Sequence, residues 1–182
     1  MNNHESHFTD VPKTGSSLKI MSWNINHIND SNLGDKTEIE EFKSNLNSAM
    51  IFCLQETKGE VTFQNYRCLN SLRQGSKSGG ICIGVHRSLE KHIKHLVTGN
   101  DDFQAIVISP SVTGLDKEAM LINVYDSPEN SSFKMRTKKR NDGDTITTLD
   151  ALIEFQAKHN YAHVLITGDL NARTGYQNFN PK

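Results

Sequence analysis

Short apolar segments that end abruptly in polar residues recur along this chain. Four of them share this form and lie at 18–23, 49–54, 119–122 and 163–167. Apolar runs of about four to eight residues are typical of buried β-strands. Three further strands are expected at 66–72, 79–86 and 103–109. The last two are expected to be antiparallel neighbours, separated by a charged, turn-rich stretch at 90–102.

Two segments, 37–47 and 144–159, show the apolar spacing of amphipathic helices. Thr37 and Glu40 match a capping box at the start of the first helix, and Asp144 is the expected cap of the second. Many strands with two helices predict an α/β fold in which two packed sheets are flanked by helices.

Polar side chains lie within four residues after the end of four of these strand-like segments. In chain order they are Asn24, Glu56, Tyr125, Asp169 and Asn171. Residues two positions apart on a strand point the same way, so the carboxylate of Asp169 and the amide of Asn171 share one side. Such an oxygen-rich group can orient a water, accept its proton or touch a hard cation. Four strand ends of this kind predict one shared site.

Five short motifs occur in order around these residues. They are Ser22-Trp23-Asn24, Leu54-Gln55-Glu56-Thr57, Ser78-Gly79-Gly80-Ile81, Asn123-Val124-Tyr125 and Gly168-Asp169-Leu170-Asn171. Together, over residues 18–175, they resemble the endonuclease/exonuclease/phosphatase superfamily, which includes apurinic endonucleases, DNase I and the endonucleases of non-LTR retrotransposons. Segments 123–128 and 168–175 are most similar to those of a retrotransposon endonuclease.

The resemblance implies a four-layered α/β sandwich that hydrolyses phosphodiester bonds, with DNA as the partner and Mg²⁺, or Mn²⁺ in its place, as the cofactor. Glu56 would be the metal ligand, and Asn24 would touch the metal or the phosphate. Tyr125 would donate a hydrogen bond to a phosphate oxygen. Asp169 would align and deprotonate the attacking water, and Asn171 would help to hold that water or the phosphate.

Each of these residues also has an ordinary structural explanation when taken alone. Glu56 could be a surface residue paired with Lys58, and Asn24 could stabilise its own turn. Tyr125 could be a half-buried strand residue, and Asp169 could belong to a β-turn. The presence of all five motifs in order favours the functional interpretation.

A basic run follows the Tyr125 segment. Its cations are Lys134, Arg136, Lys138, Lys139 and Arg140. A cationic loop beside a phosphoester site would neutralise phosphates, so these residues are candidate nucleic-acid contacts. A solvated loop and a nuclear-localisation patch are the alternatives.

Composition narrows the remaining possibilities. A chain of 182 residues fits one domain, and a net charge of −1 argues against a globally basic nucleic-acid coat. Three cysteines without metal-ligand spacing fit reduced thiols in the nucleus or cytoplasm. No apolar run approaches the roughly 18 residues that span a bilayer, so no membrane partner is expected. Residues 1–17 are expected to form a flexible polar tail.

The family motif near the C-terminal end, a Ser-Asp-His-like segment, has no counterpart after Asn171. We therefore expect 18–182 to be an incomplete domain that cleaves DNA weakly or not at all, and that is fused to a reverse transcriptase in the full-length protein. Two alternatives stay open. One is a non-catalytic remnant that binds nucleic acid or protein, and the other is a phosphatase of the same fold.

Overall fold

The structure is a computed structural model that describes residues 17–30, 34–73, 79–127, 138–139 and 145–171. Its centre is a pair of four-stranded sheets. The first has the strand order β1-β4-β6-β5, with β1 (Ile20–Asn24), β4 (Ile51–Gln55), β6 (Ile81–His86) and β5 (Tyr66–Ser71). The second has the order β12-β9-β8-β7, with β12 (His163–Asp169), β9 (Ala119–Tyr125), β8 (Phe103–Ile108) and β7 (Ile93–Leu96).

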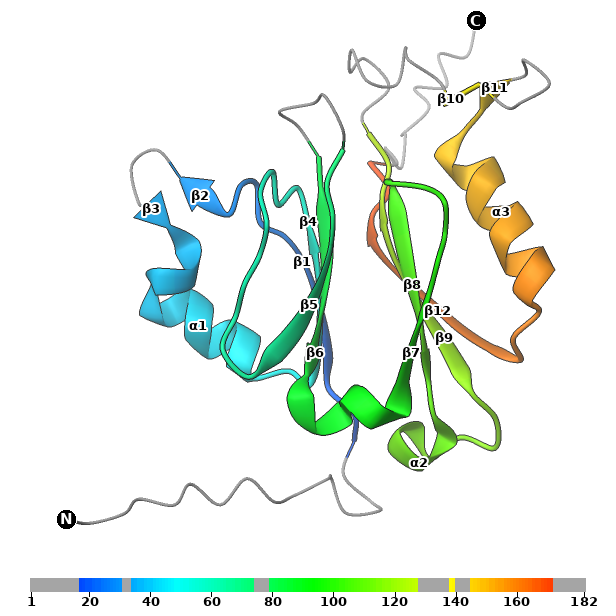
Figure 1. Ribbon diagram of the computed structural model, residues 1–182, viewed down its shortest axis with the longest axis horizontal. Coiled ribbons are helices and arrows are strands. Elements are labelled where there is room, and N and C mark those ends of the chain that lie inside the picture. The colour runs from blue at the N-terminus through cyan, green and yellow to red at the C-terminus, as the bar shows by residue number, and fades with distance from the viewer. Residues whose placement is uncertain (1–16, 31–33, 74–78, 128–137, 140–144, 172–182) are drawn as a thin grey trace, which may run out of the picture.

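The helices lie on the outer faces of the two sheets. In Figure 1, α1 (Glu40–Asn47) covers the first sheet and α3 (Thr148–His159) covers the second. The smaller elements are η1 (Lys36–Glu38), η2 (Arg87–His92), α2 (Pro110–Thr113) and the two-residue strands β2 (Asn29–Asp30), β3 (Gly34–Asp35), β10 (Lys138–Lys139) and β11 (Thr145–Ile146). This arrangement confirms the expected α/β sandwich. None of the helices in these described ranges is long and apolar enough to span a bilayer.

Strand alternation produces separate apolar layers. Phe52 and Leu54 point toward α1, where they pack with Phe42 and Leu46. Ile51 and the alternate residues of neighbouring strands point between the sheets and form the central layer. That layer consists of Ile51, Cys53, Ile83, Val85, Leu89, Ile106, Ile108 and Leu121. A third cluster fills the space between the second sheet and α3, and includes Phe103, Ile122, Val124, Leu152 and Phe155.

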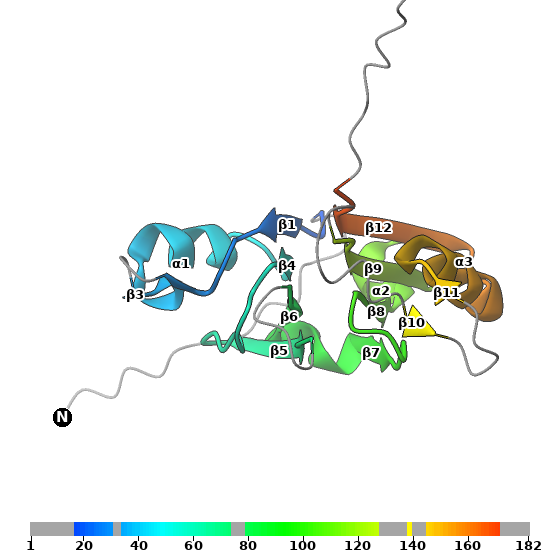
Figure 2. The same ribbon diagram turned by 90° about the horizontal axis from the view of Figure 1, so that it is seen from above.

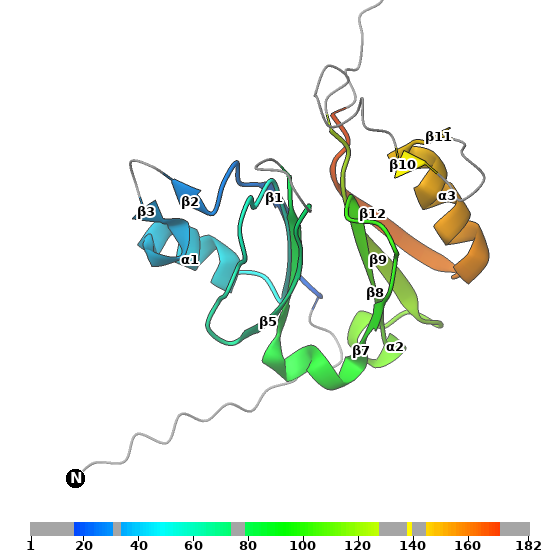
Figure 3. The ribbon, with the colours of Figure 1, turned by 45° about the horizontal axis from the view of Figure 1, so that its top comes forward.

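The two sheets place their parallel strands at the same edge. β1 pairs in parallel with β4, and β12 pairs in parallel with β9, whereas the other pairs are antiparallel. Figure 2 shows β1 and β12 side by side at one edge, with β5 and β7 at the other. In Figure 3 the carboxyl ends of β1, β9 and β12 come forward along one rim. Residues that follow these strands can therefore meet.

Two predicted helix starts are wrong. The first helix begins at Glu40, and Thr37 lies instead in the 3₁₀ turn that Asp35 caps, so the Thr37–Glu40 capping box does not form. The second helix begins at Thr148, where Thr147 and Asp150 form the capping box. The predicted cap Asp144 lies outside the described residues. In each case a nearby side-chain oxygen caps the helix or turn where the chain actually enters it.

The expected pairing of 79–86 with 103–109 is also wrong. β6 pairs with β4 and β5 in the first sheet, whereas β8 pairs with β7 and β9 in the second. The chain crosses between the sheets through η2, and the following stretch, expected to be only a turn-rich connection, contains β7. β7 was missed because a short strand with two exposed polar residues lacks a clear apolar signal.

Candidate active site

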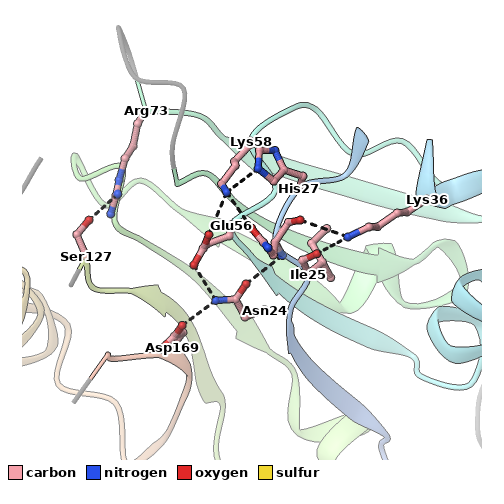
Figure 4. A network of polar contacts seen from close by, with 10 residues as sticks. Asn24, Ile25, His27, Lys36, Glu56, Lys58, Arg73, Ser127 and Asp169 are labelled. Carbon is pink, nitrogen blue, oxygen red and sulfur yellow. Dashed lines mark hydrogen bonds and ion pairs between the residues drawn. The ribbon is translucent and has the colours of Figure 1, made fainter. Parts of the chain in front are cut away.

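An asparagine at the end of β1 joins the two sheets at the shared rim. The side-chain amide nitrogen of Asn24 donates to Glu56 Oε1 at 3.0 Å and to Asp169 Oδ2 at 2.7 Å (Figure 4). Its amide oxygen accepts a hydrogen bond from the backbone N–H of Asn26 at 3.1 Å. Asn24 is therefore placed as a donor that holds two carboxylates from different sheets next to one another.

Glu56 has an unusual backbone conformation. Its φ of 53° lies in the left-handed region, which is uncommon for a residue with a long side chain. The conformation is held on both sides, because His27 N–H donates to Glu56 O at 2.7 Å and Thr57 N–H donates to Gly80 O at 3.1 Å. Backbone strain of this kind costs about 1–3 kcal/mol and tends to occur at functional sites.

The Gly79-Gly80 pair lets its backbone lie close to the segment 56–58. Both glycines have positive φ, 85° and 86°. A Cβ on Gly80 would lie 2.7 Å from Thr57 Oγ1, and a Cβ on Gly79 would lie 2.7 Å from Arg73 Cδ. Gly79 and Gly80 thus leave room for Arg73 and Thr57 rather than supplying a chemical group.

The charge of Glu56 is stabilised by its neighbours. Burial raises the pKa of its carboxyl, but hydrogen bonds from Asn24, Lys58 and Tyr125 outweigh this effect and leave the pKa below its ordinary value. The phenol of Tyr125 is the donor in the third contact, and burial together with the Glu56 carboxylate raises the pKa of Tyr125 far above its ordinary value. At neutral pH, Glu56 is therefore an anion and Tyr125 a hydrogen-bond donor.

Lys58 pairs with the carboxylate of Glu56. Its Nζ lies 3.3 Å from Glu56 Oε2, 2.9 Å from Asn26 Oδ1 and 2.8 Å from His27 Nε2. The ion pair that would explain Glu56 as an ordinary surface residue is therefore present. It coexists with contacts from Asn24 and Tyr125, which an ordinary surface pair does not require.

Asp169 and Asn171 form the second-sheet side of the site. Asp169 Oδ1 accepts from the backbone N–H of Asn171 at 2.9 Å, so each carboxylate oxygen of Asp169 accepts from a donor in the described part of the chain. The amide of Asn171 donates to Asp126 O at 2.6 Å and joins the segments that follow β9 and β12. An ionised carboxylate accepts up to about four hydrogen bonds, so Asp169 can also accept one from a water.

A layer of buried amides lies directly below this rim, between the sheets. Gln55 Nε2 donates to Asn123 Oδ1 at 2.7 Å, and Asn123 Nδ2 donates to the carbonyls of Leu54 and Cys82 at 3.1 and 3.2 Å. Both side chains are almost fully buried. The layer connects the strand that precedes Glu56 with the strand that ends in Tyr125.

Residues 21–181 match the endonuclease/exonuclease/phosphatase family. The chain belongs to this family. No curated protein matches the sequence. Family members are generally hydrolytic nucleases or phosphodiesterases and usually use divalent metals.

A solved structure of an endonuclease domain has a similar fold. The endonuclease domain of TRAS1, a telomere-specific non-LTR retrotransposon, superposes with a TM-score of 0.59 at 16% identity, over 87% of this chain and 63% of that domain. An AP endonuclease from Archaeoglobus fulgidus gives 0.49 at 18% identity, over 85% and 58%. TDP2 from C. elegans gives 0.45 at 20%, over 86% and 48%. The chain thus spans less than two thirds of each of these proteins.

The side chains at this rim suit a magnesium site in which the protein supplies only a few of the ligands. The described ranges contain no group of three or more His, Cys, Asp or Glu side chains that could hold a metal. Mg²⁺ commonly needs only one or two carboxylates, with waters and substrate phosphate completing its coordination. Glu56 fits that requirement, and the ammonium of Lys58 shows that a cation is favourable beside it.

The basic run is described only in part. Lys138 and Lys139 form β10, which pairs with β11, while Lys134, Arg136 and Arg140 lie outside the described residues. Another cation near the site, Arg73, was not predicted; it contacts Tyr125, Asp102 and Ser127. No sequence signal could have indicated it, because these partners are distant along the chain and meet only in the fold.

Proposed function

We propose that this chain hydrolyses phosphodiester bonds in DNA, with Mg²⁺ as the cofactor, in the manner of a retrotransposon endonuclease. The observation that carries the proposal is the single hydrogen-bonded cluster of Asn24, Glu56, Tyr125 and Asp169, contributed by both sheets. An isolated turn or surface ion pair would not bring a carboxylate, a phenol and a second carboxylate together on one rim.

The residues would divide the work as follows. Glu56 would hold the metal, which when bound neutralises charge on the phosphate and the leaving oxygen. Asp169, oriented by Asn24 and the Asn171 N–H, would align the attacking water and accept its proton. Tyr125 would release its hydrogen bond to Glu56 and donate its O–H to a phosphate oxygen instead. Asn171, whose amide donates to Asp126 O, would hold together the segments that follow β9 and β12.

A nicking assay tests this proposal. Supercoiled plasmid, an excess of protein and Mg²⁺ or Mn²⁺ should give slow nicking that stops with a chelator. The rate should be low because, in the described ranges, no histidine makes a hydrogen bond with Glu56 or Asp169. Glu56→Gln and Asp169→Asn should each reduce nicking roughly a hundredfold or more, whereas Glu60→Gln, an exposed neighbour, should leave it unchanged.

The controls separate the alternatives. Nicking that survives both Glu56→Gln and Asp169→Asn would not depend on these carboxylates and would refute the proposed site. Mg²⁺-dependent hydrolysis of an aryl phosphate without nicking would favour a phosphatase. DNA binding with no hydrolysis of either substrate would favour a non-catalytic binding protein.

DNA binding by the basic run has its own test. Replacing Lys138, Lys139 and Arg140 with Ala should weaken binding to all duplex sequences alike. It should also flatten the slope of log K against log salt concentration by about 0.9 for each phosphate that the variant no longer neutralises. An unchanged slope would show that the run is a solvated connection.

A further inference from the structure

An arginine is buried beneath the tyrosine of the proposed site. The Arg73 side chain is only 2% exposed, and its Nε donates to Asp102 Oδ1 at 2.9 Å. Its Nη1 donates to Ser127 Oγ at 2.6 Å, as Figure 4 shows, and its Nη2 donates to the backbone carbonyl of Tyr125 at 3.1 Å. Its guanidinium carbon lies 4.7 Å from the centre of the Tyr125 ring.

These contacts reach Tyr125 at several points. The guanidinium touches the face of the ring and the carbonyl of the same residue, and it binds the residue two positions later, Ser127. Asp102, which accepts from Arg73, also accepts from the backbone N–H of Tyr125 through its own carbonyl at 2.8 Å. The end of β9 is thus held from two sides.

The burial of this ion pair needs an explanation other than stability. Desolvating two charges offsets most of their attraction, and well-packed apolar residues often stabilise a fold equally well. The planar guanidinium, by contrast, presents several donors in a rigid arrangement that fixes the orientation of its partners. Gly79 leaves the necessary room, since a Cβ there would lie 2.7 Å from Arg73 Nη1.

We propose that Arg73 is a positioning residue that orients the Tyr125 ring, so that its hydroxyl points at Glu56 and at the phosphate bound there. This inference rests on the proposed function for its catalytic consequence. Its structural part, the orientation of Tyr125 toward Glu56, stands without it. Arg73 does not touch the substrate in this scheme and acts only through Tyr125.

A double-mutant cycle on nicking tests the catalytic part. Tyr125→Phe keeps the ring and removes the hydroxyl, and should slow nicking about 10- to 100-fold. Arg73→Met should slow it by a similar factor, and the double variant should be no slower than Tyr125→Phe alone. Arg67→Met, on the exposed side of the same region of chain, is the matched control and should not change the rate. Multiplied effects in the double variant would show that Arg73 acts independently of Tyr125, and would overturn the proposal.

A second variant keeps the test valid if Arg73→Met does not fold. Arg73→Lys keeps the charge beside Asp102 but loses the planar group that reaches Ser127 and the Tyr125 carbonyl together. It should slow nicking less than Arg73→Met does, and this smaller effect should also disappear in Tyr125→Phe. A rate equal to that of the wild type would show that charge alone suffices, and would contradict a positioning role.

A measurement that does not depend on DNA cleavage separates this inference from the proposed function. The measurement is an NMR spectrum of protein labelled with ¹³C-tyrosine, in which the ring signals of the four tyrosines can be resolved. The signal that is missing in Tyr125→Phe belongs to Tyr125. Glu56→Gln should shift that signal, and the shift should fall by roughly half or more in the Arg73→Lys background. If the wild type does not nick DNA, the proposed function fails, and this loss of response still supports the positioning role. An undiminished response would refute it.

Discussion

The buried amide layer gives the most quantitative prediction. Asn123→Leu replaces an amide with an apolar side chain of similar size at a position that is 0% exposed. It removes the hydrogen bond from Gln55 and the two bonds to the carbonyls of Leu54 and Cys82. The amide nitrogen of Gln55 still donates to Cys53 O at 3.1 Å and to Ser22 Oγ at 3.2 Å, so it keeps hydrogen-bond acceptors in this variant.

The expected loss follows from these hydrogen bonds. A buried hydrogen bond contributes about 0.5–1.5 kcal/mol net, so three of them give a loss of roughly 3 kcal/mol in the free energy of unfolding. For a chain of this length, that loss should lower Tm by about 6–12 °C. Asn45→Leu, an exposed position on α1, is the matched control and should stay within about 0.5 kcal/mol of the wild type.

Urea unfolding of four proteins measures the effect. These are the wild type, Asn123→Leu, Gln55→Leu and the double variant. Removing both partners leaves fewer unsatisfied groups than removing one, so the double variant should be about 1 kcal/mol more stable than the sum of the single losses predicts. If Asn123→Leu unfolded like Asn45→Leu, or if the two losses simply added, the amide layer would not be a coupled network and the reasoning would be wrong.

Three further predictions concern the rim. Lys58→Met should tighten Mn²⁺ binding about two- to fivefold by calorimetry, because the ammonium 3.3 Å from Glu56 competes with the metal; weaker binding would contradict this. The lowered pKa of Glu56 means that its charge is fully present above its ordinary value of 4.5 and is lost as the pH falls through the folded value. Mn²⁺ affinity should therefore be level between about pH 6 and about pH 8 and should fall only in acid, and a midpoint near neutrality would exclude Glu56 as the controlling group. Gly80→Ala should destabilise more than Gly99→Ala by about 1–3 kcal/mol in urea unfolding, since both have positive φ but only Gly80 lies against Thr57; equal losses would refute the close-approach argument.

Much of the site can be predicted from the sequence because the ends of strands are local features of the chain. Asn24, Glu56, Tyr125 and Asp169 each follow an apolar segment, and the structure brings these four side chains into one cluster. The order of motifs was also enough to indicate the family, which the match over residues 21–181 confirms.

The partners of these residues were decided only by the tertiary structure. Arg73 and Asp102 are 29 residues apart, and Gln55 and Asn123 are 68 apart, so no local pattern links them. The assignment of β6 and β8 to different sheets was likewise decided only by the tertiary structure. An apolar run indicates that a strand is buried but does not indicate which strand lies beside it. Hydrophobic spacing depends on neighbours along the chain, whereas hydrogen-bond pairing depends on neighbours in space, and the second set exists only after the two sheets have packed.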